Sequence, residues 1–201
     1  MIRNIIFDLG RVLIKFDPEM FVDRIKPENE EDRQLLLNNI FKAKEWAEMD
    51  AGILNEDEMY EIVKTRLPER LHEKAYELIY NWSNPVVMIE GMSDVVRECK
   101  RKGYGLYLLS NASTRVPRYW NTVEGSECFD GMVISAIEKE IKPERRIYEI
   151  LLNRYHLKAE ECLFIDDTLR NVEGAQAVGI KGYHFDGNVE KLRKYLNCLD
   201  C

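Results

Sequence analysis

Five short, mostly apolar runs are spread along the chain, and they constrain its fold more than any other feature. The runs are Ile2–Phe7, Gly105–Leu109, Met132–Ile134, Cys162–Ile165 and, more weakly, Lys181–Phe185. Their apolar residues are continuous rather than alternating with polar ones. We therefore expect strands that are buried on both faces of a parallel sheet.

Helical patterns separate these runs. Ile89–Lys102 has an apolar face and is followed by Gly103, a residue typical of helix C-termini. Pro143–Tyr155 is expected to begin with proline at its first helical position, and Asn171–Val178 ends before Gly179. This alternation of strand and helix predicts an α/β fold, in which helices cover both faces of the sheet.

One segment of about seventy residues has no strand-like run. Its amphipathic stretches predict four helices, namely Phe21–Ile25, Leu35–Met49, Glu56–Thr65 and Glu69–Trp82. A connection between parallel strands needs only one helix. We therefore predict a helical domain of residues 16–85, inserted into an α/β domain of residues 1–15 and 86–201. The acidic residues Glu28, Glu30, Glu31 and Asp32 are expected to form a solvated face at a helix N-terminus.

Charge and cysteine content exclude several classes of protein. The 29 basic and 36 acidic side chains give a net charge of −7, which argues against a general nucleic-acid binder. The apolar runs are far shorter than the ~20 residues that cross a bilayer, and Asp8 and Arg11 interrupt the only one near Met1. The odd number of cysteines, five, predicts reduced thiols in a cytoplasmic protein, and the isolated pair Cys198 and Cys201 is expected to be a helix end. The sequence does not indicate an oligomeric state.

Polar side chains follow three of the predicted strands at the point where each strand ends. Asp8 follows the first, Ser110 and Asn111 the second, and Asp166 and Asp167 the fourth. Lys142 lies in the loop before the helix predicted at Pro143. Ligands bind beyond the carboxyl ends of the strands in an open parallel sheet. If these strands are neighbours, the side chains form one site rather than separate helix caps.

Three carboxylates at one edge repel each other, and a divalent cation removes that repulsion. Mg²⁺ prefers carboxylate, water and phosphate oxygens. With the cation, Lys142 and Ser110 neutralising a phosphoryl group, Asp8 is placed to attack phosphorus and to form an aspartyl phosphate that water hydrolyses. The pattern predicts metal-assisted phosphoryl transfer.

Four motifs in this order resemble those of the haloacid dehalogenase-like (HAD) hydrolases over nearly the whole chain. They are IIFDLGRVLI at residues 5–14, LYLLSN at 106–111, IKPERRIYEIL at 141–151 and CLFIDDTLRNVEGAQAVGI at 162–180. The resemblance implies a Rossmann-like, three-layer core with an inserted helical cap of the C1 type. It also implies Mg²⁺ as the cofactor.

The same resemblance implies a role for each motif residue. Asp8 is the nucleophile, Ser110 binds phosphate, Lys142 is the family lysine, and Asp166 and Asp167 bind metal. Most phosphatases of the family have a second aspartate two residues after the nucleophile, which supplies a metal-binding carbonyl and the general acid. Here that position is Gly10, so the carbonyl remains and the carboxyl is missing. Asp17, Asp50 and a water molecule are the candidate replacements.

The FDLGxVL form of the first motif is similar to a bacterial branch that includes α-D-glucose-1-phosphate phosphatases, which suggests a sugar phosphate or another small phosphorylated metabolite as substrate. Trp46, Asp50 and Gly52 fit the cap pattern of that branch. We expect Arg11, Asn111, Trp46 and Asp50 to join Ser110 and Lys142 in binding substrate, although Trp46 is equally consistent with helix packing and Arg11 with an exposed side chain.

Two other functions remain open at this point. A 2-haloacid dehalogenase would use Asp8 to attack carbon without a metal, which is consistent with Gly10. The pair Asp166 and Asp167 argues against it, because two anions without a cation would repel a carboxylate substrate. A HAD scaffold with a weak catalytic or purely regulatory role is supported only by Gly10.

Overall fold

The computed structural model describes residues 1–200, and Cys201 of the C-terminal cysteine pair lies outside them. Its centre is a five-stranded parallel sheet in the order β3-β2-β1-β4-β5. The strands are β1 (Asn4–Phe7), β2 (Gly105–Ser110), β3 (Gly131–Ile134), β4 (Cys162–Asp166) and β5 (Lys181–His184). All five predicted strands and the α/β class are confirmed.

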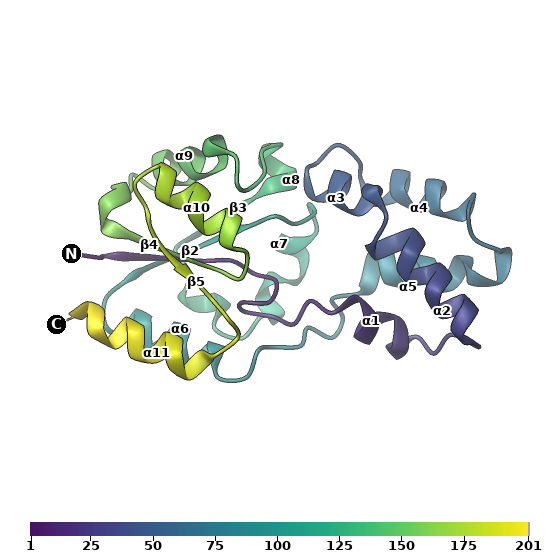
Figure 1. Ribbon diagram of the computed structural model, residues 1–201, viewed down its shortest axis with the longest axis horizontal. Coiled ribbons are helices and arrows are strands. Elements are labelled where there is room, and N and C mark those ends of the chain that lie inside the picture. Colours follow the sequence, from purple (N-terminus) through teal and green to yellow (C-terminus); the bar gives the residue numbers. More distant parts are fainter. Residues whose placement is uncertain (201) are drawn as a thin grey trace.

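Helices cover both faces of the sheet (Figure 1). On one face lie α6 (Met92–Arg101) and α11 (Val189–Asn197), and on the other α9 (Arg145–Arg154) and α10 (Leu169–Ala177). Successive residues of β1 face opposite layers, because Ile5 and Phe7 pack with α6 while Ile6 packs with α9. This explains why the strand sequences are apolar without alternation. The expected three-layer core is confirmed.

Short helical turns connect the remaining parts of the sheet domain. They are α7 (Val116–Tyr119), α8 (Ser135–Glu138) and 3₁₀ turns at Trp120–Thr122, Ser126–Cys128, Ala159–Glu161 and Cys198–Asp200. None of the helices in residues 1–200 has the length and apolar character needed to cross a membrane.

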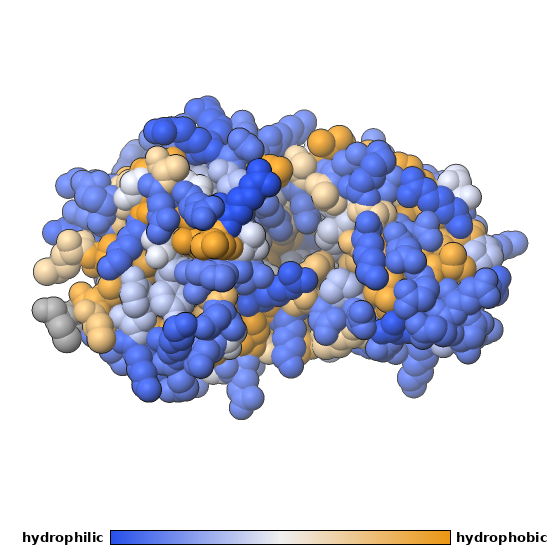
Figure 2. Space-filling model, viewed as in Figure 1, coloured by the Kyte–Doolittle hydropathy of each residue, from blue (hydrophilic) through white to orange (hydrophobic). Residues whose placement is uncertain are grey.

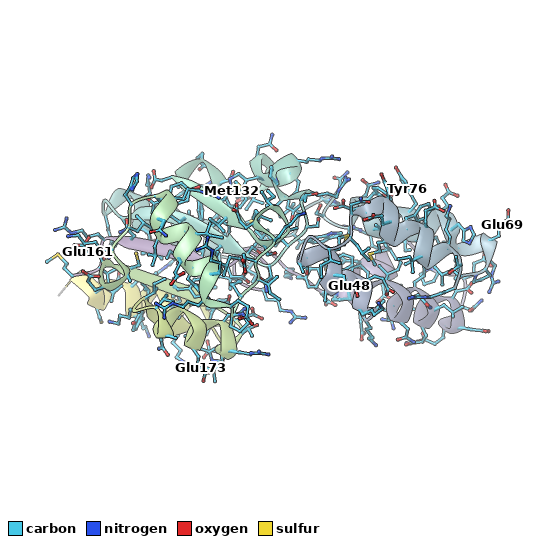
Figure 3. The ribbon with its side chains drawn as sticks, turned by 90° about the horizontal axis from the view of Figure 1, so that it is seen from above. Glu48, Glu69, Tyr76, Met132, Glu161 and Glu173 are labelled. Atoms are coloured by element: carbon cyan, nitrogen blue, oxygen red, sulfur yellow. The ribbon has the colours of Figure 1, made fainter. Side chains whose placement is uncertain are left out.

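The segment between β1 and α6 forms a helical lobe beside the sheet (Figure 1). It contains α1 (Pro18–Arg24), α2 (Glu30–Leu36), a π-helical turn (Leu37–Phe41), α3 (Lys44–Asp50), α4 (Glu56–Lys64), a 3₁₀ turn (Glu69–Leu71) and α5 (His72–Asn81). Figure 3 places Glu69 at the far end of this lobe, while Met132 and Glu161 mark the sheet domain. The lobe has its own apolar core, which includes Leu36, Met59 and Leu78. The predicted division at residues 16–85 stays a prediction.

Side-chain caps begin three of the lobe helices, among them α1 and α4. The Asp17 carboxylate accepts hydrogen bonds from the backbone N–H groups of Glu19 and Met20. Asn55 and Glu58 form a reciprocal capping box at α4. Both arrangements satisfy N–H groups that a helix end leaves unpaired.

Three local predictions are wrong. The helix predicted over Leu35–Met49 is interrupted, because Ala43 is extended (ψ 149°) and the break brings the Phe41 ring to 4.6 Å from Trp46. Helix α9 begins at Arg145 rather than Pro143, since Glu144 is extended (ψ 135°). Asp32 is fully buried rather than solvated, because it accepts a 2.6 Å hydrogen bond from Arg70.

Candidate active site

The carboxyl ends of β2, β1 and β4 bring the predicted residues together. Phe7 is in register with Leu108 on one side and with Ile165 on the other. Asp8, Ser110 and Asp166 therefore lie at one edge of the sheet. A cavity of about 430 Å³ opens there between the sheet domain and the helical lobe. The recess between the two parts is visible in the space-filling view (Figure 2).

Lys142 links two of the aspartates at the base of this cavity. Its Nζ donates hydrogen bonds to Asp8 Oδ1 (2.7 Å) and to Asp166 Oδ2 (2.6 Å). The lysine is 3% exposed and Asp166 is fully buried. Burial opposes the charge on Lys142, but the two carboxylates outweigh it and raise its pKa. The side chain is therefore a fixed cation beside Asp8.

Both carboxylate oxygens of Asp166 accept hydrogen bonds. In addition to Lys142, its oxygens accept hydrogen bonds from the Thr168 backbone N–H (2.7 Å) and from the Asn171 side chain (3.1 and 3.2 Å). These donors hold the carboxylate in one orientation. Asn171 was not predicted as a site residue, although its position five residues after Asp166 in the fourth motif was a usable signal.

The residues present fit a divalent cation. Asp8, Asp166 and Asp167 each offer an oxygen, and these atoms lie within 4.8 Å of one another. The Gly10 carbonyl accepts no hydrogen bond from residues 1–200. Burial raises the pKa of Asp8 to about 6 and also raises that of Asp167, and in both cases Asp166 adds to the effect. A hard cation that prefers oxygen ligands would relieve this repulsion.

Ser110 and Asn111 both line the cavity, and their side chains differ in whether they are hydrogen-bonded. Ser110 is 2% exposed, and its hydroxyl has no hydrogen-bond partner in the described part of the chain. The Asn111 side chain, by contrast, donates to the Lys142 carbonyl (3.0 Å) and accepts from the Lys142 N–H (2.8 Å). Asn111 thus lines the cavity but its amide positions the Lys142 loop, whereas the Ser110 hydroxyl is available to a ligand.

Arg11 lies at the rim of the cavity in a left-handed backbone conformation (φ 60°). Its Nε donates to the Phe16 carbonyl (3.3 Å), and one terminal nitrogen lies 3.9 Å from Asp167 Oδ2. The side chain is 60% exposed. Arg11 therefore lies at the cavity and is exposed, and its part in substrate binding stays a prediction.

Four aromatic rings also line the cavity, and we call them the aromatic wall. It consists of Phe16, Trp46, Trp82 and Tyr119. The rings are in contact, with centroid distances of 5.3 Å for Phe16 and Trp82 and 6.0 Å for Trp82 and Tyr119. The structure thus places Trp46 both in the lobe core and at the cavity.

Asp50 is the predicted lobe carboxylate that lines this cavity, whereas Asp17 does not line it. The other rings of the wall were missed. Phe16, Trp82 and Tyr119 come from three separate segments, and no local pattern indicates that they meet.

Comparisons with known proteins show what the chain is similar to. The family model described as haloacid dehalogenase-like hydrolase matches residues 2–179. A sesquiterpene phosphatase from Aspergillus oryzae is 28% identical over 204 residues, covering 96% of each chain. A D-ribitol-5-phosphate phosphatase from Bacteroides thetaiotaomicron is 24% identical over 191 residues, covering 91% of each.

The fold is also similar to that of a solved structure. A HAD family enzyme from Bacteroides thetaiotaomicron, crystallised with magnesium and inorganic phosphate, has a TM-score of 0.71 and 25% identity. The match covers 96% of this chain and 99% of that one.

Proposed function

The chain belongs to the haloacid dehalogenase-like hydrolases, and from this premise we propose that it is a Mg²⁺-dependent phosphatase that hydrolyses a small phosphomonoester through an aspartyl phosphate on Asp8. The observation that carries the proposal is the position of Lys142 between Asp8 and Asp166, beside Asp167 and beneath one cavity. The phosphatase names of the two relatives support the reaction class.

Each residue has a defined part in this reaction. Asp8 attacks the phosphorus atom, and the bond to the leaving-group oxygen breaks. Lys142 and the Ser110 hydroxyl neutralise negative charge on the phosphoryl oxygens, and Lys142 also reduces the repulsion between Asp8 and an incoming phosphate dianion. Water then attacks the phosphorus of the aspartyl phosphate and releases Asp8.

Mg²⁺ is the cofactor, and when bound it supplies further neutralisation of the phosphoryl oxygens. Asp8, Asp167 and the Gly10 carbonyl would hold it. Asp166, predicted as a ligand from its motif, also belongs to this set, but its hydrogen bonds to Thr168 and Asn171 favour a role in orienting Lys142 and the metal site. The Mg²⁺ and phosphate in the related crystal structure support this cofactor.

A sugar phosphate is the first candidate substrate. The resemblance to glucose-1-phosphate phosphatases favours it, and the ribitol-5-phosphate phosphatase is a relative that acts on a polyol phosphate. Asp50, Ser113 and Arg170 line the cavity and offer polar partners for hydroxyl groups.

An apolar alcohol phosphate is the second candidate, and the aromatic wall favours it. Four contacting rings and Ile14 present mostly carbon to the leaving group. A hydroxyl-rich leaving group placed against them would lose hydrogen bonds to water without replacement. The sesquiterpene phosphatase among the relatives supports this candidate.

A paired substrate assay tests the proposal. Phosphate release is measured with Mg²⁺ for glucose 1-phosphate, ribitol 5-phosphate and farnesyl monophosphate, and Asp8→Asn is the blank. The proposal predicts that Asp8→Asn lowers turnover of every substrate by at least about 10³-fold. Full activity of this variant would overturn the nucleophile. Chloride release from a 2-haloacid that is unaffected by a chelator would instead identify a dehalogenase.

The same assay separates the two substrate candidates when it includes Trp82→Ala. Loss of the Trp82 ring should raise KM for farnesyl monophosphate far more than for ribitol 5-phosphate if the wall binds the leaving group. An equal change for both would favour the sugar phosphate.

A further inference from the structure

The leaving group of an alkyl phosphate departs as a strongly basic alkoxide unless its oxygen receives a proton, and protonation contributes about 10²- to 10⁴-fold to such reactions. The loop after Asp8 supplies no acid, because Leu9 and Gly10 have none and Arg11 stays charged. The proton must come from another group that lines the cavity.

Most titratable groups in the cavity are already engaged. Lys142 is bonded to Asp8 and Asp166, and Asp167 belongs to the metal-binding set. Asp17 is excluded, because it is exposed and accepts hydrogen bonds from the first turn of α1.

Asp50 differs from these groups because its carboxyl is free. It lines the cavity, and within residues 1–200 it forms no side-chain hydrogen bond or ion pair. It is the last residue of α3, the lobe helix that lies beside α8 of the sheet domain (Figure 1).

The backbone of Asp50 is held firmly against the sheet domain. Its carbonyl accepts a hydrogen bond from the Ser135 hydroxyl, and that hydroxyl accepts one from the Ala112 N–H (2.9 Å). Two residues later, Gly52 approaches Ala136 so closely that a Cβ there would lie 2.3 Å from the Ala136 oxygen. Asp50 is therefore a lobe residue at a fixed position over the core.

We propose that Asp50, supplied by the helical lobe, is the general acid and base of this enzyme and replaces the carboxyl that is missing at position 10. The proposal rests on the proposed phosphatase function. It assigns to the lobe a catalytic residue in addition to substrate binding.

The proton movements balance over the two steps. In the first, Asp8 forms a bond to phosphorus, the bond to the leaving-group oxygen breaks, and that oxygen takes the proton of the Asp50 carboxylic acid. In the second, the Asp50 carboxylate takes a proton from water as the water oxygen attacks phosphorus. The bond to Asp8 then breaks, phosphate leaves, and Asp50 is again protonated.

The surroundings of Asp50 are suited to holding a proton. Burial, followed by the charges of Asp8 and Glu56, raises the pKa of Asp50 well above its ordinary value. Tyr119 also faces it, and burial together with Asp50 raises the tyrosine pKa.

The test compares leaving groups that differ in their need for a proton. The variants are Asp50→Asn, Asp50→Asn with Gly10→Asp, and Glu48→Gln as a control. Glu48 is on the same helix (Figure 3), its carboxylate pairs with Lys44, and it does not line the cavity. The double variant is sterically allowed, since a Cβ on Gly10 would meet Phe16 Cβ at 3.5 Å, an ordinary contact.

Butyl phosphate and p-nitrophenyl phosphate are the substrates, with Mg²⁺ present. Asp50→Asn should lower kcat for butyl phosphate by about 10²- to 10⁴-fold. With p-nitrophenyl phosphate it should still release one nitrophenol per active site in a fast burst, followed by slow turnover because water is no longer activated. Gly10→Asp should restore butyl phosphate turnover in the Asp50→Asn background.

Two results would overturn the assignment. If Asp50→Asn slows the burst and butyl phosphate turnover equally, Asp50 acts in substrate binding or folding instead. If the variant affects neither, another group is the acid. Both differ from failure of the proposed function, in which the unaltered protein hydrolyses neither substrate.

Discussion

Lys142 Nζ lies 2.7 Å from Asp8 Oδ1, although the two residues are 134 positions apart in the chain. The contact joins the end of β1 to the loop before α9, and Asp166 at the end of β4 accepts the second hydrogen bond of the same ammonium. The lysine therefore stabilises the site and balances the charge of its nucleophile.

Lys142→Met should lower both activity and stability. Removing one partner of a buried ion pair costs about 3–5 kcal/mol, because the remaining charge is left uncompensated. We expect the free energy of unfolding in urea at neutral pH, without Mg²⁺, to fall by about 3 kcal/mol. Lys158→Met is the matched control, since Lys158 is 69% exposed and its pairing contributes little. Equal, small losses for both would show that the buried pair is not structural.

Stability without metal should decrease as the pH rises from about 4 to 7. Burial raises the pKa of Asp8 from 3.8 to about 6, so in this interval the folded protein holds a proton that the unfolded chain has released. The stabilisation that this bound proton provides is lost as the pH rises through about 6. Mg²⁺ should therefore raise Tm more at pH 7.5 than at pH 5.

Differential scanning calorimetry with Mg²⁺ and with a chelator measures this effect. Asp8→Asn has no ionising group at this position and should weaken the pH dependence, while Asp50 and Asp167, whose pKa values are also raised, still contribute to it. A Mg²⁺-induced change in Tm that is the same at both pH values would contradict the linkage between Asp8 and the metal.

Gly52→Ala should impair catalysis as well as stability. Gly52 has φ 69°, and an added Cβ would lie 2.3 Å from the Ala136 oxygen, so the lobe must move away from the core. Gly103→Ala is the control, because Gly103 has φ 88° but nothing within 4 Å. Both variants should lose about 1 kcal/mol of stability from the left-handed backbone alone.

Only Gly52→Ala should also lower kcat/KM, since only it displaces the segment that carries Asp50. Steady-state kinetics and thermal unfolding of the two variants give the comparison. Equal kinetic effects would show that the contact between Gly52 and Ala136 does not position the lobe.

The sheet and the base of the site could be predicted because their information is local. A strand buried on both faces must be apolar at every position, as Ile5, Ile6 and Phe7 are. Polar residues directly after such strands must lie at one edge once the strands are parallel. Asp8, Ser110 and Asp166 follow from these two facts.

Tertiary contacts decide the features that were missed. Asp32 looks like a solvated acid until Arg70, 38 residues away, is placed beside it. The Phe41 and Trp46 rings pack across a break in a continuous helical pattern. Trp82 and Tyr119 join the cavity from opposite sides of α6 in the sequence, and only the fold brings their rings to 6.0 Å.

The covalent intermediate gives the most direct test of the central claim. The protein is mixed with a phosphomonoester and Mg²⁺, quenched in acid within one turnover and treated with borohydride, which reduces an aspartyl phosphate to homoserine. Peptide mass spectrometry then identifies the modified residue. We predict homoserine at position 8 and at no other aspartate. Rapid hydrolysis with an unmodified Asp8, or with homoserine at another position, would contradict the account.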